Sequence, residues 1–549
     1  METPKLVALL QEFFSGDIEY DDQTLQTYSH DTSLYEIVPQ VIVFPKNRED
    51  IKKLVEFVSL KKKDYPNLSL TARSAGTDMS GGAINNSIIV DFTRYFTDIG
   101  EINETGTSVE PGVYYRNFEK KTLRHGLLLP SYPASRQICA LGGMVNNNSG
   151  GERTLRYGKT IDYVKNIRMV LSDGNEYQFG RISKEKLAEK MQQRDFEGRI
   201  YKQMYQLIEN NYDLIKSAKP AVSKNSTAYN IWDVWDREYF DLSKIFVGAQ
   251  GTLGINTRTT VTLVPRLKRY GLLVIYVNDI KVLPHLIQDV LKHSPVSFEA
   301  FDDETLKLAI RFMPQFARVL GVVGTFKMGM QFLPNLIRFA TKGIPKFTLL
   351  VEFDGKSARE IREKVHALKE SLGIYVVRLE AVESEAKAKQ YFTIRRESFN
   401  LLRKNVKDKH TAPFIDDFIV RPEYLVDFFP RLTEILDRNE IHSTLAGHMG
   451  DGNFHIIPLM EIEKESEREK IEKVQQEVQD LVLEYKGSIS AEHNDGMVRG
   501  PFIKQMYGQE MFEIFKEVKN IFDPDNIFNP HKKTDARLSF SQKYIRQKF

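Results

Sequence analysis

Three glycine-rich segments are the feature that most constrains the fold of this 549-residue chain. They are RSAGTDMSGG at 73–82, LGGMVNNNSGG at 141–151 and GAQGTLG at 248–254. Glycine lets backbone N–H groups converge on an anion, because no Cβ blocks close approach or a positive φ. None of the three fits a Walker loop, and no G-x-G-x-x-G opens a helix after a strand. Their number and order still indicate one large phosphate-bearing ligand.

The first glycine-rich segment follows a strand–helix–strand pattern. Apolar runs at 41–44 and 68–72 are typical of strands, and apolar residues within 51–58 fall on one helical face. A further apolar strand is expected at 88–92, and another at 245–247, directly before the third glycine-rich segment. A phosphate-holding loop belongs at the end of such a strand.

The pattern changes after Pro265, and we place a domain boundary near 265–270. Strands are predicted at 271–277 and 347–353, with helical stretches between them. The charge-dense stretch that begins at 461 predicts a solvated helix with one buried face. Near the C-terminus, apolar spacing predicts a last helix over 512–522.

Composition is typical of a globular protein and excludes several classes of function. The chain is 41% hydrophobic and 28% charged, and its net charge of +3 gives no global field for nucleic acid. Its single cysteine, Cys139, excludes an intrachain disulfide and an iron–sulfur cluster held by several cysteines of this chain. The first residues lack the basic region of a signal peptide, so we expect a cytoplasmic protein.

Histidines gather in the last quarter of the chain. Four of the eleven lie between 442 and 493, and three of these stand in the segments GHMGDGNFH (447–455) and SAEHNDG (490–496). In a regular strand His448 and His455 would point to opposite faces, but the glycine turn between them can fold one back. Two imidazoles and a carboxylate suit zinc, manganese or iron(II). For His442 we expect an ordinary surface or core role.

These motifs together resemble the VAO/PCMH-type FAD-dependent oxidoreductases, in the metal-containing D-2-hydroxy-acid dehydrogenase branch. The resemblance rests on the glycine-rich segments, PSYPAS at 130–135, Tyr157-Gly158 with Asp162, and G-H-x-G-D-G-N-x-H with E-H. It implies an α+β fold: a PCMH-type FAD-binding domain of two α+β subdomains, plus an antiparallel-sheet cap (substrate) domain with helices. The implied division is an N-terminal helical segment 1–34, the FAD domain 35–268, the cap 269–505 and a returning C-terminal segment 506–549.

The resemblance also implies site residues. FAD would be bound noncovalently, since the first glycine-rich segment holds no histidine. His448, His455 and Glu492 would be ligands of a divalent metal, zinc before manganese or iron, and His493 would be the catalytic base. Arg395 would bind the substrate carboxylate as a planar charged fork. The FAD-contacting residues implied are Ser74, Ala75, Gly76, Thr77, Asp78, Ser135, Gly142, Gly143, Asn148, Ile255 and Asn529.

The activity implied is oxidation of a D-2-hydroxy acid to the 2-oxo acid, with metal-assisted alkoxide formation, a histidine base and hydride transfer to flavin. Two alternatives stay open. One is a flavoenzyme of other chemistry, an ether-lipid synthase or alcohol oxidase, which needs no metal at these residues. The other is a noncatalytic flavin-binding subunit of a larger oxidase. No motif marks the substrate side chain.

A basic, apolar insert occupies 306–346. Between Leu306 and Val351 there are seven basic residues and no acidic one, interleaved with large apolar side chains. Its short helices cannot span a bilayer, but such a segment can lie in an anionic membrane interface. A lid over the cap or a subunit contact, as in a homodimer, is an equal alternative. Membrane contact would favour a quinone as electron acceptor, and a protein held peripherally at the inner face of the membrane.

Overall fold

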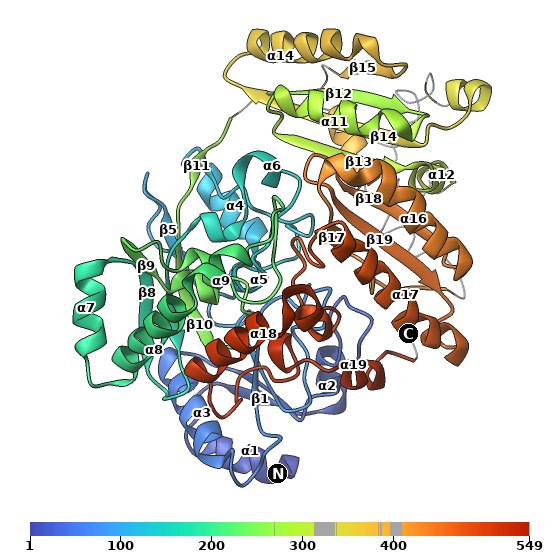
Figure 1. Cartoon of the computed structure of the whole chain (residues 1–549). Coiled ribbons are helices and arrows are strands. Elements are labelled where there is room, and N and C mark those ends of the chain that lie inside the picture. The colour runs from blue at the N-terminus through green and yellow to red at the C-terminus, as the bar shows by residue number, and fades with distance from the viewer. Residues whose placement is uncertain are drawn as a thin grey trace.

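The computed structural model describes residues 1–267, 269–311, 335, 337–382, 384, 387–395 and 409–547. Figure 1 shows a lower part with a four-stranded sheet, a five-stranded sheet, the two-stranded pair of β6 (Leu127–Leu128) and β11 (Val264–Pro265) and their helices, and an upper part built on one larger sheet. We call the upper part the cap. The C-terminal helix α18 (Ile503–Phe522) lies with the lower part, although the chain reaches it from the cap. The fold is α+β, as the sequence indicates.

The first sheet carries the first glycine-rich segment. Its strands follow the order β1-β2-β4-β3, with β2 and β3 parallel to β4 and β1 antiparallel to β2. The segment 1–34 supplies α1, α2 and also β1. The predicted strand–helix–strand pattern is confirmed, and the glycine-rich segment leaves the carboxyl end of β3. The bounds are α1 (Thr3–Gln11), β1 (Asp17–Glu19), α2 (Asp22–Tyr28), β2 (Val41–Phe44), α3 (Arg48–Lys61), β3 (Leu70–Arg73) and β4 (Ile88–Asp91).

Helix α3 begins where the sequence signals it. Asn47 is its N-cap, and its side-chain oxygen accepts the backbone N–H of Asp50 at 3.0 Å, which satisfies a donor that the helix leaves free. Ile51, Leu54, Val55 and Val58 are fully buried and share one face of the helix. That face packs in the core cluster that also holds the apolar residues of β2 and β4.

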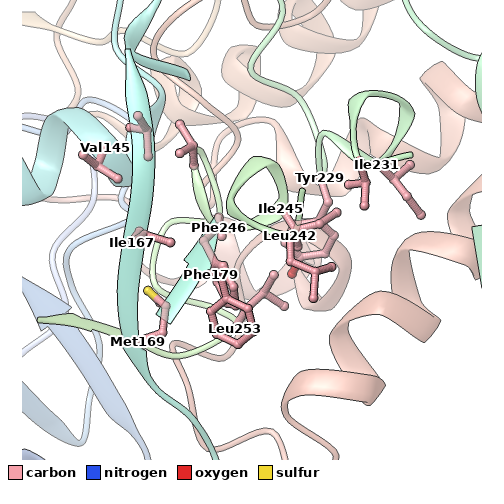
Figure 2. Packing of buried hydrophobic residues seen from close by; sticks show 14 of the residues in the cluster. Val145, Ile167, Met169, Phe179, Tyr229, Ile231, Leu242, Ile245, Phe246 and Leu253 are labelled. Carbon is pink, nitrogen blue, oxygen red and sulfur yellow. The ribbon is translucent and has the colours of Figure 1, made fainter. Parts of the chain in front are cut away.

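The second sheet is antiparallel, in the order β5-β10-β7-β8-β9. Figure 2 shows Ile167 and Met169 of β7 facing the rings of Phe179 and Phe246, whose centroids lie 4.8 Å apart. The elements are β5 (Thr107–Val109), α4 (Tyr115–Leu123), β6 (Leu127–Leu128), α5 (Leu141–Asn147), α6 (Thr154–Tyr157), β7 (Val164–Val170), β8 (Glu176–Ser183), α7 (Lys184–Gln192), α8 (Phe196–Asn210), α9 (Tyr212–Ser217), β9 (Tyr239–Asp241), α10 (Ser243–Phe246), β10 (Ile255–Val261) and β11 (Val264–Pro265).

One predicted strand is wrong. Residues 245–247 do not form a strand, because Ser243–Phe246 is the helix α10 and Val247 follows it. The run is buried on all sides, so a short apolar stretch gives no periodicity that separates a strand from a helical turn. Asp241 favours the helix, since its carboxylate accepts the backbone N–H of Ser243 at 3.0 Å.

The cap sheet is antiparallel, in the order β15-β12-β14-β13-β18-β19-β16, and β17 pairs with β19. The predicted strands 271–277 and 347–353 are confirmed as β12 and β14. The cap elements are β12 (Arg269–Val277), α11 (Leu283–Lys292), β13 (Ser297–Asp302), α12 (Asp303–Arg311), β14 (Phe347–Gly355), α14 (Ala358–Ser371), β15 (Arg378–Val382), β16 (His410–Thr411), β17 (Phe418–Ile419), α16 (Leu425–Arg438), β18 (Ser443–His448), β19 (Asn453–Met460) and α17 (Glu465–Glu484).

The two faces of the cap sheet carry different cores. Leu273, Ile275 and Val277 of β12 point into a large cluster with α11, α14, α16 and α17. The alternate residues of β12 point to the opposite face, toward Leu306 of α12 and Tyr391. The first cluster also holds Leu34, Tyr35 and Ile84, so it extends into the lower part of the molecule.

The C-terminal segment ties the cap to the lower part. Helix α18 buries Phe515 and Val518 in the core of the second sheet. Farther along, the backbone N–H of Asn529 donates to the carbonyl of Leu70 in β3 at 2.8 Å. A last short helix, α19 (Leu538–Lys543), follows.

The insert 306–346 is described only in part, within α12 and at 335 and 337–346. The stretch 312–334, on which the prediction of membrane contact mainly rests, lies outside the described residues. Among the residues that the structure does describe, no helix has both the length and the apolar character to cross a bilayer.

Candidate functional site

One cavity of about 660 Å³ lies where the cap meets the lower part. The glycine-rich segments form one side of it, and the cap supplies Arg395, His448 and His455 on the other. Glu492 and His493 also reach it, from the segment between α17 and α18. The structure therefore brings the predicted phosphate loops and the predicted histidine cluster to one space.

The first glycine-rich segment is held in shape from within. Asp78 accepts the backbone N–H groups of Ser80 at 3.1 Å and Gly82 at 2.6 Å, and its other oxygen accepts Asn147 Nδ2 at 2.6 Å. Gly76 has a φ of +64°, where side chains are strained, and a Cβ there would lie 2.4 Å from Arg73 Nη2. Asp78 thus shapes the loop rather than presenting a free charge.

Eight of the eleven predicted cofactor residues line this cavity: Ser74, Ala75, Gly76, Thr77, Asp78, Ser135, Gly142 and Gly143. Gly142 is closely packed, since a Cβ there would lie 2.6 Å from both Pro111 Cβ and Ser74 Oγ. A Cβ at Gly143 would meet nothing within 4 Å.

The other three predicted cofactor residues lie behind the wall. Asn148 accepts the backbone N–H of Ile161 at 3.0 Å, and Ile255 is buried in the core of the first sheet. Asn529 donates to the carbonyls of Gly82 at 2.8 Å and Gln250 at 2.7 Å. Its side chain therefore positions two loops that do line the cavity.

The β18–β19 hairpin puts both predicted histidine ligands on one face. Ala446 pairs with His455, and His448 pairs with Asn453. His448 and Ala446, two apart on β18, share a face, so His448 and His455 share it as well. Gly452 makes the tight turn with a φ of +74°, and a Cβ there would lie 1.9 Å from the Val420 carbonyl oxygen. Only glycine fits this position.

Glu492 meets the two histidines from a separate segment. Its Oε1 lies 3.1 Å from His448 Nε2 and 3.4 Å from His455 Nε2. Asp417 holds the segment, because its carboxylate accepts the backbone N–H groups of Ala491, Glu492 and His493 at 2.7–3.0 Å. The ligand atoms of Asp417, His455, Glu492 and His493 all lie within 4.8 Å of one another.

Each imidazole has a carboxylate behind it. His448 Nδ1 lies 2.7 Å from Glu299 Oε1. The two oxygens of Asp416 lie 3.0 Å from His455 Nδ1 and 2.6 Å from His493 Nδ1. An ionised carboxylate only accepts, so the protons belong on Nδ1, and the Nε2 atoms face the cavity. Carboxylates placed in this way orient metal-binding histidines in proteins.

The charges of the site call for a cation. Burial lowers the pKa of His455, but Asp416 and Glu492 outweigh it and raise that pKa to about 10. Burial also lowers the pKa of His493, and Asp416 and Asp417 raise it above its usual range. Without a bound cation, the imidazoles of His455 and His493 retain protons that balance the charge of the neighbouring carboxylates. A divalent cation among the Nε2 atoms and Glu492 satisfies the same charges, so the donor set fits a metal.

Two buried lysines and an arginine complete the site. Lys224 Nζ lies 3.3 Å from Glu492 Oε2 and 3.2 Å from Asp451 Oδ2. Lys159 Nζ donates to the carbonyl of Ala491 at 2.5 Å, and burial lowers its pKa to about 7. Arg395 pairs through Nη2 with Glu299. The sequence predicts Arg395, which lines the cavity, whereas Glu299, Asp416, Lys159 and Lys224 were not predicted.

Comparison with protein families decides the identity of the chain. Residues 39–180 match the FAD binding domain, and residues 272–533 match the C-terminal domain of FAD linked oxidases. The first match contains the glycine-rich segments at 73–82 and 141–151, and the second contains Arg395, His448, His455, Glu492 and His493, which also line the cavity. The chain is an FAD-linked oxidase of the VAO/PCMH type. The resemblance seen in the sequence is thus confirmed, and FAD is its cofactor.

Similar proteins include enzymes and a subunit of an enzyme. D-2-hydroxyglutarate dehydrogenase of Pseudomonas putida is 26% identical over 536 residues, which are 96% of this chain and 51% of that protein. The corresponding protein of Escherichia coli is 27% identical, with the same coverage. Glycolate oxidase subunit GlcD of Bacillus subtilis is 26% identical, over 94% of each chain. This FAD-linked oxidase thus spans about half the length of the first two relatives.

Solved structures bear out the fold. Alkyldihydroxyacetonephosphate synthase has a TM-score of 0.65 at 15% identity, over 96% of this chain and 85% of that one. P-cresol methylhydroxylase has a TM-score of 0.67 at 14% identity, over 98% and 97%. At such identities the likeness shows that this FAD-linked oxidase shares their architecture, and no more.

Proposed function

We propose that this protein oxidises a D-2-hydroxy acid to the corresponding 2-oxo acid, with FAD as the hydride acceptor. One observation carries the proposal: His448, His455 and Glu492 converge, with His493 beside them, on the cavity that the glycine-rich loops line. A flavoenzyme of ether-lipid or phenol chemistry has no need of this arrangement. The names of the relatives support the same reaction class.

Noncovalent FAD would lie along the loop residues Ser74 to Asp78 and the turn at Gly142-Gly143. Bound FAD supplies the acceptor for the hydride that leaves C2 of the substrate. The loop's part is to offer backbone N–H groups to the pyrophosphate and to hold the ring at a fixed distance from His493. Asn148, Ile255 and Asn529 would support this wall from behind.

His448, His455 and Glu492 would hold a divalent metal, with zinc first and manganese or iron as alternatives. Such a metal supplies a Lewis acid that stabilises negative charge on the substrate oxygens. Glu299 and Asp416 keep the histidine Nε2 atoms turned toward it, and Lys224 keeps Glu492 in place.

His493 would take the proton of the substrate hydroxyl at Nε2. Asp416 supports this role, because it holds the proton at Nδ1 and stabilises the imidazolium that results. Arg395 would bind the substrate carboxylate. It is buried and lines the cavity, and its guanidinium carries more donors than its pair with Glu299 uses.

Reduced FAD must pass its electrons on, and we propose a quinone or another diffusible acceptor, since Cys139 alone cannot hold an iron–sulfur cluster. The insert 306–346 would bring the protein to an anionic membrane surface, with a homodimer contact as the other use of the same segment.

We also propose a division of the chain into an N-terminal segment 1–34, an FAD domain 35–268, a cap domain 269–505 and a C-terminal segment 506–549.

The test is anaerobic mixing of the FAD-loaded protein with paired D- and L-2-hydroxy acids, followed by the visible absorbance of the flavin. We expect bleaching by one D-acid and not by its L-enantiomer. His493→Ala should keep FAD and metal but slow the bleaching by about 10²- to 10⁴-fold. The matched control is His442→Ala, outside the cluster. Metal-loaded protein that no 2-hydroxy acid bleaches would refute the proposal.

A further inference from the structure

The cap sheet places apolar and short side chains directly beside the histidines. In β19, Ile457 lies two residues after His455 and therefore on the same face. Its cross-strand partner is Thr444, just as Ala446 is the partner of His455. All four line the cavity. Cross-strand partners keep their Cβ atoms about 5 Å apart, so Ile457, Thr444 and Ala446 form a continuous surface next to the proposed metal.

Helix α12 supplies the facing part of the wall. Thr305 and Leu308, three residues apart, lie on one face of α12, and both line the cavity. The helix is tied to the sheet at its start, because Asp302 accepts the backbone N–H groups of Thr305 at 2.8 Å and Leu445 at 3.0 Å. Leu308 and Ile457 are thus carried by elements that are fastened to each other.

Among the cap residues that the structure describes, one group supplies the positive charge that lines the cavity. On the described residues of the cap, Arg395 is the one lysine or arginine that lines the cavity. It already faces Glu299, and its remaining donors suffice for a single carboxylate. A second carboxylate on the substrate would lie against Leu308 and Ile457, and a buried charge without a partner is strongly disfavoured.

We propose that the substrate is a 2-hydroxy acid whose side chain is short, aliphatic and uncharged, and that Leu308 and Ile457 select it. This inference rests on the proposed function and adds the class of side chain. The 2-hydroxy carboxylate group lies at Arg395 and the histidines. The side chain points along the surface made by Ile457, Ala446 and Leu308, so dicarboxylates are poor substrates.

The experiment compares kcat/KM for D-2-hydroxybutyrate and D-2-hydroxyglutarate in the FAD- and metal-loaded protein. We expect the first to be favoured by at least about 100-fold, since sites discriminate strongly against groups that they leave unpaired. Ile457→Lys should cut this ratio at least tenfold by giving the distal carboxylate a partner. Ile456→Val is the matched control: Ile456 points to the opposite face of β19, into the core, and the ratio should not change.

A second pair of variants keeps the test independent of a lysine in the wall. Ile457→Ala and Leu308→Ala should raise the relative kcat/KM for the longer D-2-hydroxy-4-methylpentanoate by about tenfold, because each opens room for a branched chain. Preference of the unaltered protein for D-2-hydroxyglutarate would overturn the inference and leave the proposed function standing. Absence of flavin reduction by every 2-hydroxy acid would instead overturn both.

Discussion

Asp416→Asn would test the arrangement behind the two histidines most directly. The Asp416 side chain is buried, and each of its oxygens accepts one imidazole Nδ1, from His455 and from His493. The amide that replaces it has the same shape but only one oxygen. One imidazole can keep its proton at Nδ1, whereas the other must present Nδ1 as an acceptor to the amide N–H. That second imidazole then carries its proton at Nε2, where it can neither bind a metal nor take a proton.

The size of the effect depends on which of the two histidines moves its proton from Nδ1 to Nε2. If His455 changes its tautomer, metal affinity should fall about 10- to 100-fold, as for other carboxylates behind ligating histidines. If His493 changes, flavin reduction should slow by about 10²- to 10⁴-fold, since a base in the wrong tautomer is nearly inactive. The lost charge also lowers the pKa of His493, which Asp416 holds up against burial, so the acid limb of the pH–rate profile should move to lower pH.

The assay is anaerobic stopped-flow reduction of the flavin by a D-2-hydroxy acid, together with the metal-to-protein ratio of the same sample. Asp302→Asn is the matched control, because Asp302 is a half-buried cap carboxylate that accepts the backbone N–H groups of Thr305 and Leu445 and lies outside the histidine cluster. We expect the control to retain metal and rate within about threefold, whatever it loses in stability. A variant Asp416→Asn that binds metal normally and reduces flavin at the normal rate would refute the reasoning.

Three further perturbations have distinct expected outcomes. Gly142→Val should weaken FAD binding at least tenfold in a flavin-release titration, because its side chain would meet Pro111 and Ser74, whereas Gly373→Ala in the cap, where a Cβ meets nothing within 4 Å, should not. In the metal-free protein, Lys224→Met should lower the free energy of unfolding by about 3–5 kcal/mol in urea, since it removes the lysine that pairs with two buried carboxylates. Burial, together with the nearby Asp78, raises the pKa of Asp31 to about 7, so the folded state binds this proton more tightly than the unfolded chain does. The free energy of unfolding should therefore fall as pH rises from 4 to 7. In Asp31→Asn this fall should be smaller by at most about 4 kcal/mol.

Local sequence patterns were enough to predict the elements that have strong periodicity. The strand at 41–44, the helix that begins after Asn47 and the strand at 271–277 are where the pattern puts them. The run at 245–247 was not predictable, because all three of its residues are buried and apolar, so it has no polar position to reveal its period. Pairing order in the cap depends on contacts between residues far apart in the sequence, which no local pattern records.

The residues of the site also divide into those that a local sequence pattern marks and those that it does not. His448, His455 and Glu492 could be predicted as a group because turn glycines and an E-H pair mark them in the sequence. Asp416 and Glu299 could not, since their roles depend on β13, β18 and the loop before β17 meeting in space. A signal was nevertheless present. Glu299 lies in the apolar strand SFEAFD, and Asp416 lies in the apolar stretch FIDDF; a charged residue inside such a run is rarely tolerated unless it is paired.

The segment that carries Glu492 and His493 explains how two separate domains can share one reaction centre. On its cap side the backbone N–H groups of Glu492 and His493 donate to the Asp417 carboxylate. On its other side Asn494 donates to the carbonyl of Gly248 at 2.8 Å, and the backbone N–H of Gly496 donates to Gln250 Oε1 at 2.8 Å. Hydride transfer needs the reacting atoms held to a fraction of an ångström. Because this segment is hydrogen-bonded on one side to the cap and on the other to the glycine-rich loops, it would set the distance between His493 and the flavin in the proposed reaction.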